Sequence, residues 1–420
     1  MADETFLTDD FLRQLINVGE VDILVGLPTH NNARTIGPIV QTIQAGILRW
    51  FPRDRAVIIN ADGGSRDGTP ELVTGASIDD VRRATNLPAL RTLHSVSTRY
   101  GNSPEDAVAL HTILAAAELL QAKACVVVSA ESSSIAGDWL SKLLQPVRTD
   151  AFELVTPTYR RHKFEGLLIT NLLYPMTRAL YGFNVREPYT RDFALSGQFA
   201  TDFLSRNGWE DRANDDGIEL RLTLSALRER RRICQAFLGD REHVEHRGAD
   251  LVPALRHTVG TLFSAMEDDF ALWSTVNGSR QVATHGPDHE TLMEPLRVNR
   301  KRLREMFSTG VAELEDVFQQ ILSSTTVAEL QRISTLTETD FHYPADLWVR
   351  TVYEFAASHR KSVISRDHII QAMAPLFRGR ALTFLIENRN SSSEEIESNI
   401  EALCIEFERQ KPFLVEMWKQ

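Results

Sequence analysis

AVIINADGGSRDGT, residues 56–69, runs from an apolar strand directly into a polar, glycine-rich turn. A short apolar, β-branched run bounded by glycine and aspartate predicts a buried strand. Glycines let the backbone turn sharply and approach a ligand, and Asp62 stands at the strand's end, where α/β sheets bind ligands. The alternative interpretation is an Asp/Gly-rich turn whose carboxylates only cap the next helix.

A second polar loop follows an earlier apolar run, in GLPTHNNARTIG (residues 26–37). Strand-like runs also occupy residues 21–27 and 124–129, and segments with helical spacing lie between them at 34–50 and 105–120. This alternation predicts successive βα units around a parallel sheet. Two consecutive strands would then end in polar loops that lie side by side.

The stretch 154–238 is mixed and continues the same domain. We expect a helix around 166–181, a loop over VREPYTRDFALSGQ (residues 185–198) and a helix across 216–228. After His246 the sequence changes to amphipathic helices with no strand-like runs between them.

Three segments follow from this pattern: an N-terminal helical lead-in at 1–20, an α/β domain at 21–250 and a helical region at 251–420. The helical region could pack on the α/β domain, and its apolar faces could also build a homodimer.

The bulk composition is that of a globular protein, with 420 residues of which 43% are hydrophobic. The net charge of −11 repels a polyanionic backbone and argues against nucleic acid as the main partner. No run of 18 apolar residues occurs and the N-terminus is acidic, so we expect no membrane span and a cytoplasmic location. Cys125, Cys234 and Cys404 are far apart, and we expect buried, reduced thiols.

Several segments together resemble the GT-A glycosyltransferases, and more closely the group of glucosyl-3-phosphoglycerate, glucosylglycerate and mannosylglycerate synthases. They occur in the family's order over residues 26–267: GLPTHNNARTIG, NADGGSRDGT, SSSIAGDWL, FALSGQ, DDGIELRLTLSAL and GADLVPALRHTVGTLFSAME. The resemblance implies a Rossmann-like mixed sheet flanked by helices. It also implies transfer of a hexose, glucose or mannose, from a nucleoside-diphosphate sugar to a small hydroxyl acceptor, a glycerate-like acid or a sugar, with retention.

The resemblance assigns the nucleoside of the donor to two loops, through Pro28, Thr29, Asn32, Asp62, Gly63 and Gly64. In this assignment Asp62 holds the base, and the short polar side chains of the first loop line the nucleoside. A carboxylate suits that role because it accepts hydrogen bonds from the donor groups on the edge of a base.

The metal site of the family is altered in this sequence. In these enzymes the fourth strand ends in a DxD-type motif that binds a divalent metal on the donor's pyrophosphate, but here VVVSAESSS (residues 126–134) leaves only Glu131. The family's other ligand is a histidine, and His243 falls at the matching place. The resemblance therefore implies Mg²⁺ or Mn²⁺ held by Glu131 and His243. The alternative interpretation of His243 is an ordinary surface histidine.

Two further segments depart from the family. Before Asp192 the family has two glycines, whereas this chain has Thr190 and Arg191, in a loop that the family uses around the acceptor and the transferred sugar. Asp192 is then a candidate for orienting a hydroxyl group, and Arg191 either grips a carboxylate or phosphate or is a solvated loop charge. The phosphate-binding lysine loop is also missing from residues 98–110, although Arg99 lies nearby.

Two function hypotheses therefore stand. The first is an active hexosyltransferase whose catalytic residues are Glu131, Arg191 and Asp192. The second is a catalytically degenerate nucleotide-sugar-binding or scaffold protein on the same fold, suggested by the three altered segments. A dinucleotide-dependent oxidoreductase lacks support because no G-x-G-x-x-G follows the first strand. The base, the sugar and the acceptor stay open.

Overall fold

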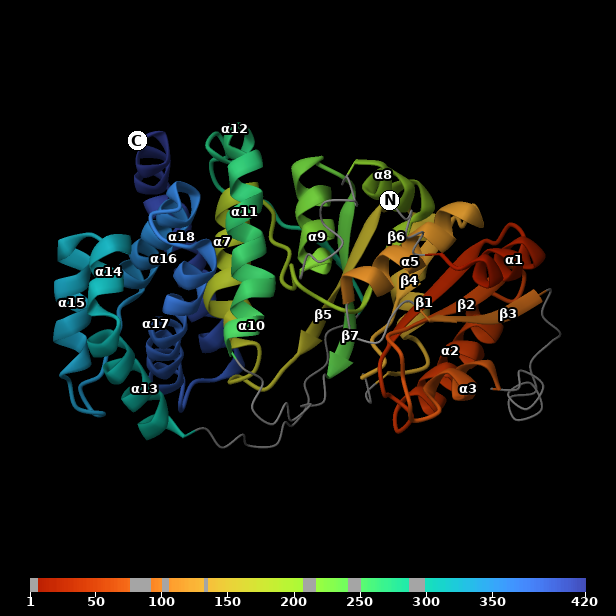
Figure 1. Ribbon diagram of the computed structural model, residues 1–420, viewed down its shortest axis with the longest axis horizontal. Helices are drawn as coiled ribbons and strands as arrows, with labels where there is room; N and C mark the ends of the chain where they lie inside the picture. Colours follow the sequence, from red (N-terminus) through yellow and green to blue (C-terminus); the bar gives the residue numbers. More distant parts are fainter. Residues whose placement is uncertain are drawn as a thin grey trace. The chain divides into compact units, whose positions relative to one another are not determined.

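The protein's computed structural model describes residues 7–75, 92–99, 106–131, 135–206, 217–240, 251–286 and 299–420. These residues fall into two compact units (Figure 1). The α/β unit takes its described residues from 1–160, 190–244 and 282–291. The helical unit takes its described residues from 161–189, 245–281 and 292–420.

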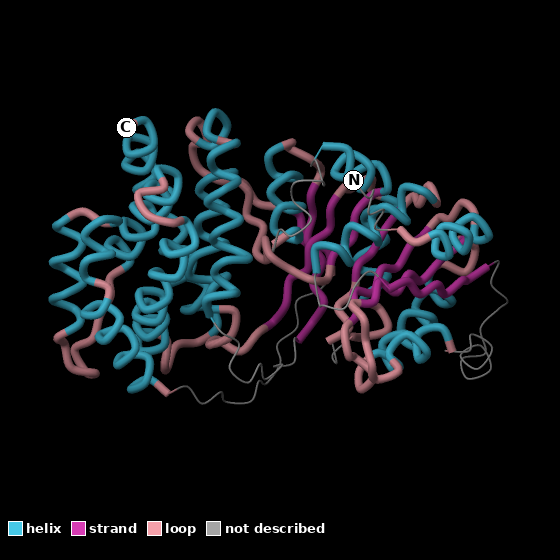
Figure 2. Tube along the Cα trace, viewed as in Figure 1, coloured by secondary structure: helices cyan, strands magenta, loops and turns pink. Residues whose placement is uncertain are grey.

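One sheet forms the centre of the α/β unit, with the strand order β3-β2-β1-β4-β6-β5-β7-β8 (Figure 2). Neighbouring strands are parallel, except that β6 runs antiparallel to both β4 and β5. The strands are β1 (Ile23–Thr29), β2 (Arg55–Asp62), β3 (Thr92–Arg99), β4 (Ala124–Val127), β5 (Leu154–Arg160), β6 (Phe193–Ser196), β7 (Ile233–Asp240) and β8 (Ala283–His285).

Helices cover both faces of this sheet. The helices of the unit are α1 (Asp9–Val18), α2 (Ile36–Trp50), α3 (Thr69–Thr74), α5 (Asp106–Leu119), α6 (Trp139–Thr149), α8 (Gly197–Arg206) and α9 (Ile218–Arg228). The apolar faces of α2 and α6 join Ile23, Val25 and Leu27 of β1 in one core cluster. Helix α5 covers the other face, which explains why β1 and β2 are almost continuously apolar.

Gly26 of β1 marks the closest approach of helix α5 to the sheet. A Cβ atom at Gly26 would lie 2.4 Å from Cγ2 of Ile113, a fully buried residue of α5. Gly37, in the first turn of α2, has no atom within 4 Å of the corresponding position. The contact of α5 with β1 therefore requires glycine at position 26 but not at position 37.

We expect Gly26→Ala to destabilise the protein by about 1–3 kcal/mol, because the added methyl group overpacks the interface with Ile113. Gly37→Ala is the matched control, and it should be neutral or stabilising by up to about 1 kcal/mol, since alanine favours the helix. Urea unfolding of both variants measures the difference. Equal free energies of unfolding for the two variants would contradict the close approach.

The predicted fold class, a mixed α/β sheet flanked by helices with a helical C-terminal region, is confirmed. The sequence predicted the strands that became β1, β2 and β4 and named none for β3, β5 or β7. Two further strands contradict a predicted element: β6 lies inside the predicted loop 185–198, and β8 lies in a region predicted to be helical throughout. Both are too short, at four and three residues, for an alternating pattern to appear. Their hydrogen bonds come from neighbouring strands, which a local pattern does not report.

The compact units are discontinuous in sequence, unlike the predicted segments. Residues 161–189 belong to the helical unit, whereas the described residues of 190–244 belong again to the α/β unit. The division into 1–20, 21–250 and 251–420 stays a prediction about sequence domains, and α1 lies within the first of these segments.

The helical unit packs around long C-terminal helices. Its elements are η1 (Ile169–Leu173), α7 (Tyr174–Tyr181), α10 (Leu251–Leu255), η3 (Arg256–Gly260), α11 (Thr261–Asp268), α12 (Phe270–Trp273), α13 (Arg300–Glu313), α14 (Glu315–Ile321), α15 (Ser324–Ser334), α16 (Ala345–Lys361), α17 (Arg366–Glu387) and α18 (Ser393–Lys419). Buried Arg178 joins α7 to α18 through ion pairs with Glu401 and Glu408, at 2.5 and 2.8 Å.

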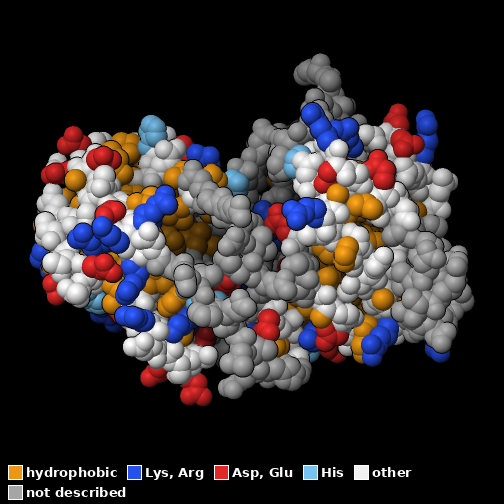
Figure 3. Space-filling view, turned by 90° about the horizontal axis from the view of Figure 1, so that it is seen from below, with side chains coloured by type: hydrophobic (Ala, Val, Ile, Leu, Met, Phe, Trp, Pro, Cys, Tyr) orange, Lys and Arg blue, Asp and Glu red, His pale blue; other side chains and the backbone are white. Residues whose placement is uncertain are grey.

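Helix α17 is, among the described residues, the one helix long and apolar enough to cross a membrane. Its most apolar window is 83% buried inside the protein, so it has the properties of a core helix. Acidic and basic side chains are interspersed on the face of the helical unit seen in Figure 3.

His359 of α16 is a buried histidine that the fold keeps neutral. It is 3% exposed and packs edge-on against Phe263 at 5.6 Å between ring centroids. Burial, and secondarily the charge of Arg366, lowers the pKa of His359 to about 4. The Glu267 carboxylate, 3.7 Å away, would favour the imidazolium ion, but it already pairs with Arg366 at 2.9 Å. The effect of burial therefore outweighs the attraction of Glu267, and the pKa of His359 is lowered.

We expect His359 to make the protein less stable as the pH falls from about 6.5 to about 4. In this window the unfolded chain binds a proton at His359 and the folded chain does not, so the free energy of unfolding decreases by up to about 3 kcal/mol. In His359→Gln this part of the pH dependence should be absent. The control His342→Gln changes an exposed histidine and should leave the slope as in the unaltered protein. A parallel pH dependence in His359→Gln would contradict the assignment.

Candidate functional site

The candidate site lies at the carboxyl edge of the sheet, where the strand order reverses. Strand β1 has β2 on one side and β4 on the other, and helices α2 and α5 pack on opposite faces. The helices that follow β1 and β4, α2 and α6, pack in one cluster on the same face, and the loops before them are hydrogen-bonded through Thr35 and Ala130. The carboxyl edge of an open α/β sheet, near a reversal of strand order, is the usual ligand site.

The loops after β1 and β2 are hydrogen-bonded to each other. The prediction that these two loops lie side by side is confirmed. The Gly63 amide donates to the Thr29 carbonyl at 2.8 Å, and Nδ1 of His30 lies 2.9 Å from the Gly63 carbonyl oxygen. The Asn31 amide donates to Oγ of Ser65 at 2.8 Å. Asn31 adopts φ 55°, a left-handed conformation that asparagine tolerates.

Further along, each loop supplies acceptors to the other. The Asn32 amide donates to Oγ1 of Thr69 and the Ala33 amide to Oδ2 of Asp67, both at 2.9 Å. These bonds order the backbone just before α2. The loops after β1 and β2 therefore form one hydrogen-bonded unit at the carboxyl edge of the sheet, which we call the loop wall.

The side chain of Asp62 holds the loop after β2 in place through hydrogen bonds. It is 2% exposed and accepts four hydrogen bonds: from the amides of Gly64 and Ser65 at 2.9 and 2.8 Å, and from the hydroxyl groups of Thr29 and Ser65 at 3.0 and 2.5 Å. A carboxylate offers about four lone-pair sites, and protein donors use all of them here. These bonds join the turn to itself and to Thr29, and none of them caps helix α3, contrary to the alternative interpretation. The contact of Asp62 with a base stays a prediction.

We expect Asp62→Asn to cost about 1–3 kcal/mol of stability, because an amide NH₂ then faces donors that have lost their acceptor. Amide hydrogen exchange at Gly64 and Ser65 should accelerate in the same variant. Asp138→Asn is the control, since the Asp138 side chain is 46% exposed and makes one surface ion pair. If exchange at Gly64 and Ser65 were unchanged, Asp62 would not be holding the loop.

The other wall is fixed by Asp192, a fully buried carboxylate at the start of β6. It accepts a hydrogen bond from the Ser129 amide at 2.9 Å and another from the Tyr159 hydroxyl group at 2.6 Å. Because β6 runs antiparallel between β4 and β5, its first residues lie at the carboxyl ends of both strands. Asp192 therefore ties three strand ends together.

Arg191 and Glu131 meet above Asp192. Nη1 of Arg191 lies 3.4 Å from Oε2 of Glu131, and the two side chains are 39% and 43% exposed. The turn that carries Glu131 is also bonded to the start of α2, because the hydroxyl group of Thr35 donates to the Ala130 carbonyl at 2.6 Å. Thr35 is the N-cap residue of α2 and makes no side-chain capping bond to that helix. The positive end of the α2 dipole thus lies beside this turn.

The described residues do not fit the metal site that the resemblance implied. Among them, no three His, Cys, Asp or Glu side chains converge as a metal cluster would. Asp192 is buried and engaged by Ser129 and Tyr159, and the Glu131 carboxylate faces a guanidinium group. His243 and its neighbour His246 lie outside the described residues. A metal at Glu131 and His243 stays a prediction.

The remaining predicted nucleoside residues lie along the loop wall. Pro28 pairs with Ala61 and Thr29 with Asp62 in the β1–β2 register. Asn32 is half-buried, and its side-chain oxygen accepts from the His30 amide at 2.7 Å. Gly63 and Gly64 are buried, with Gly64 at φ 85°. Arg99, at the end of β3, donates to the Gly64 carbonyl at 3.3 Å. The structure brings these residues together, but their roles stay predictions.

Two segments of the sequence are rich in basic residues, 160–163 and 228–232, and an arginine of each forms ion pairs within its own unit. Arg161 forms a two-point ion pair with Glu187 at 3.0 and 2.7 Å, inside the helical unit. Arg231 donates to Glu153, Asp202 and Glu229 at 2.7, 2.7 and 2.6 Å, inside the α/β unit. These arginines hold their own units together.

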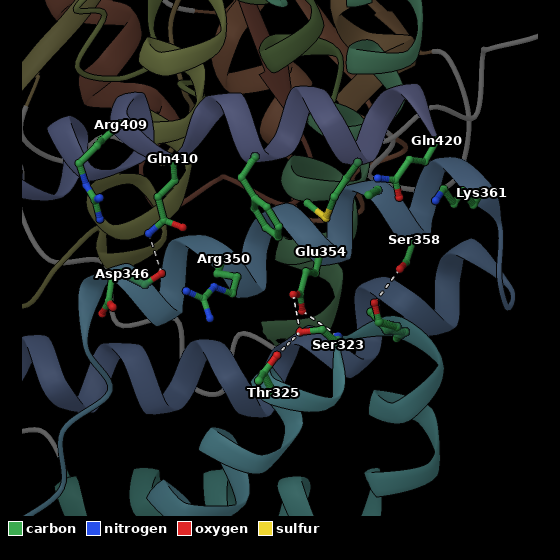
Figure 4. A pocket seen from close by; sticks show the side chains of 14 residues that line it. Ser323, Thr325, Asp346, Arg350, Glu354, Ser358, Lys361, Arg409, Gln410 and Gln420 are labelled. Atoms are coloured by element: carbon green, nitrogen blue, oxygen red, sulfur yellow. Dashed lines mark hydrogen bonds between the residues drawn. The ribbon is translucent and has the colours of Figure 1, made fainter.

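The helical unit contains a separate cavity of about 760 Å³ (Figure 4). Its lining comes from α16, α18 and the ends of α14 and α15, so none of the predicted site residues reaches it. Glu354 points into it but is 5% exposed and accepts hydrogen bonds from Ser323 and Thr326, which begin α15. The chemistry suggested by the sequence therefore belongs to the sheet edge.

Sequence reasoning missed Tyr159, Thr35 and Ser65, which position the site through hydrogen bonds. Tyr159 and Thr35 bond to partners 33 and 95 residues away, so no local pattern could have revealed them. Ser65 lies within the quoted GGSRDGT segment, where its hydroxyl group completes the turn.

No family model and no curated protein matches this sequence. Solved structures are similar in fold. Glucosyl-3-phosphoglycerate synthase from Mycobacterium tuberculosis in complex with phosphoglyceric acid is 19% identical, at a TM-score of 0.40 over 63% of this chain and 86% of that one. The same enzyme with Mn²⁺, uridine-diphosphate and glucosyl-3-phosphoglycerate is 20% identical, at a TM-score of 0.40 over 63% and 85%. A further mycobacterial protein is 20% identical, at a TM-score of 0.41 over 63% of this chain and 79% of that one.

Proposed function

We propose that the carboxyl edge of the sheet binds a nucleoside-diphosphate sugar, and that the chain is a hexosyltransferase. The acceptor is a small hydroxyl compound, a glycerate-like acid or a sugar. The observation that carries this proposal is the carboxyl edge of the sheet at the reversal of strand order, which holds both the paired loops after β1 and β2 and the Glu131–Arg191 pair.

Each wall suits one half of the donor. The loop wall offers backbone groups, Pro28 and the polar side chains of Thr29 and Asn32 for the nucleoside. Asp62 contributes by holding the amides of Gly64 and Ser65 in place. The proposed contact of its carboxylate with the base requires the base to replace one of its four present donors. At the same edge of the sheet, Arg191 carries a positive charge suited to a phosphate group.

The proposed reaction breaks the bond between the anomeric carbon and the β-phosphate oxygen. The acceptor oxygen forms a new bond to the same face of that carbon, and its proton passes to the departing diphosphate. The products are a glycoside with retained configuration and a nucleoside diphosphate. Buried Asp192 acts by positioning the loop of Arg191, and Glu131 by orienting the Arg191 guanidinium group.

The interspersed surface charges and the net charge of −11 suit a protein whose partners are small molecules. We propose a cytoplasmic location, and a homodimer built through the helical unit is part of the same hypothesis.

The test is thermal unfolding with UDP, GDP and their glucose and mannose conjugates, each with Mg²⁺, Mn²⁺ or a chelator. A nucleotide present at about 100 times its dissociation constant should stabilise the protein by about 2.7 kcal/mol. The variants Asn32→Ala and Asp62→Ala should lose this stabilisation. Arg53→Gln, an exposed change before the amino end of β2, should keep it.

Transfer is tested next, with the stabilising sugar nucleotide and a panel of small hydroxy acids and sugars. Formation of a glycoside together with free nucleoside diphosphate supports the transferase. Binding without turnover on any acceptor supports the degenerate binding protein instead, an alternative that the altered metal motif favours. If no nucleotide or sugar nucleotide shifts the unfolding temperature, the proposed function is wrong.

A further inference from the structure

The Glu131–Arg191 pair occupies the part of the sheet edge where a divalent cation was expected. Glu131 is the carboxylate that remains at the end of β4, and Nη1 of Arg191 lies 3.4 Å from it. A divalent cation bound to Glu131 would have a guanidinium group as its neighbour. The two positive charges would repel each other at this partly buried position.

The position of Arg191 is set by its backbone neighbours and not only by its ion pair. Thr190 precedes it and is 4% exposed, with its hydroxyl group accepting from the Asp192 amide at 3.2 Å. Asp192 follows it and is bonded to the Ser129 amide and the Tyr159 hydroxyl group. Because residues on both sides are fixed, the Arg191 side chain starts from a fixed point beside the end of β4.

The start of α2 adds a second positive feature to the same turn. Thr35 gives its hydroxyl group to the Ala130 carbonyl instead of capping its own helix. Gly37 lies in the first turn of α2, and a Cβ atom added there would have no other atom within 4 Å. A fifteen-residue helix therefore begins next to the turn that carries Glu131.

The amides of Thr35 and Ile36 donate to the Asn32 carbonyl at 3.0 and 2.9 Å, and Pro38 has no N–H. This end of α2 therefore acts on the turn through the helix dipole more than through open amides.

We propose that Arg191, together with the N-terminus of α2, supplies the positive charge for the donor's diphosphate, and that this chain binds its nucleotide without a divalent cation. In this arrangement Glu131 is a positioning residue that orients Arg191. A guanidinium group suits the role because it stays charged and donates two parallel hydrogen bonds to phosphate oxygens. The inference rests on the proposed function, since it concerns the same donor.

The arrangement also explains why the altered segments occur together. A carboxylate motif reduced to Glu131 would leave the diphosphate without a metal, and an arginine at 191 restores the positive charge. A glycine at 191 would leave Glu131 without its partner. The two positions therefore form one electrostatic unit, and either change alone would unbalance the charges of the site.

The test is the dissociation constant of UDP and of GDP, measured by calorimetry in the presence of EDTA, Mg²⁺ or Mn²⁺. For the unaltered protein, we expect the nucleotide that binds to keep its affinity in EDTA within a factor of about three. Arg191→Gln should weaken binding in EDTA by at least about tenfold. Arg191→Lys should retain part of the affinity, because it keeps the charge but loses the two-point grip.

Arg191→Gly gives the sharpest outcome. It frees Glu131, so Mn²⁺ should now restore much of the lost affinity, and binding should change from metal-independent to metal-dependent. Arg53→Gln is the matched control and should behave like the unaltered protein. Circular dichroism and the unfolding temperature of each variant separate a folding defect from a binding defect.

The failures of the two proposals are distinguishable. If a nucleotide binds only with a divalent cation and Arg191→Gln binds as tightly as the unaltered protein, the inference is wrong and the Glu131–His243 metal site gains support. In that case the proposed function still stands. If no nucleotide binds under any condition, the proposed function fails and the inference falls with it.

Discussion

The buried carboxylate of Asp192 is the interaction on which the site depends most. It accepts hydrogen bonds from the end of β4 and from Tyr159 of β5, and it begins the one antiparallel strand of the described sheet. Burying a polar group is costly unless it is hydrogen-bonded, so this arrangement holds only when all three strand ends are in register. The position of Arg191 beside Glu131 is a consequence of that register.

A second constraint acts on the opposite wall. The Asp62 carboxylate accepts four hydrogen bonds, from the turn itself and from Thr29 of the neighbouring strand. One wall is thus held by a carboxylate inside a loop and the other by a carboxylate between strands. Residues that are held in place before a ligand binds lose little entropy on binding, which favours tight and specific binding.

The sequence predicted what depends on local pattern. The apolar runs that became β1, β2 and β4 and the helical spacing of α2 and α5 were readable, since burial on both faces leaves continuous apolar segments. Strands β6 and β8 were missed because three or four residues carry no period. The residues that position the site act across long stretches of chain, as Thr35 does on Ala130 and Tyr159 does on Asp192, and no spacing reports such contacts. The ion pair between Glu131 and Arg191 was equally hidden, although both residues had been named separately.

We propose that the donor nucleotide lies at the carboxyl edge of the sheet, between the Asp62 loop and the Glu131–Arg191 pair. Hydrogen exchange of the amides, with and without UDP-glucose or GDP-mannose, tests it most directly. The account predicts that the nucleotide slows exchange at residues 30–37, 63–69 and 129–131, while the helices around the separate cavity, α16 and α18, are unaffected. Slower exchange confined to those helices, or no change at the sheet edge with a ligand shown to bind, would contradict it.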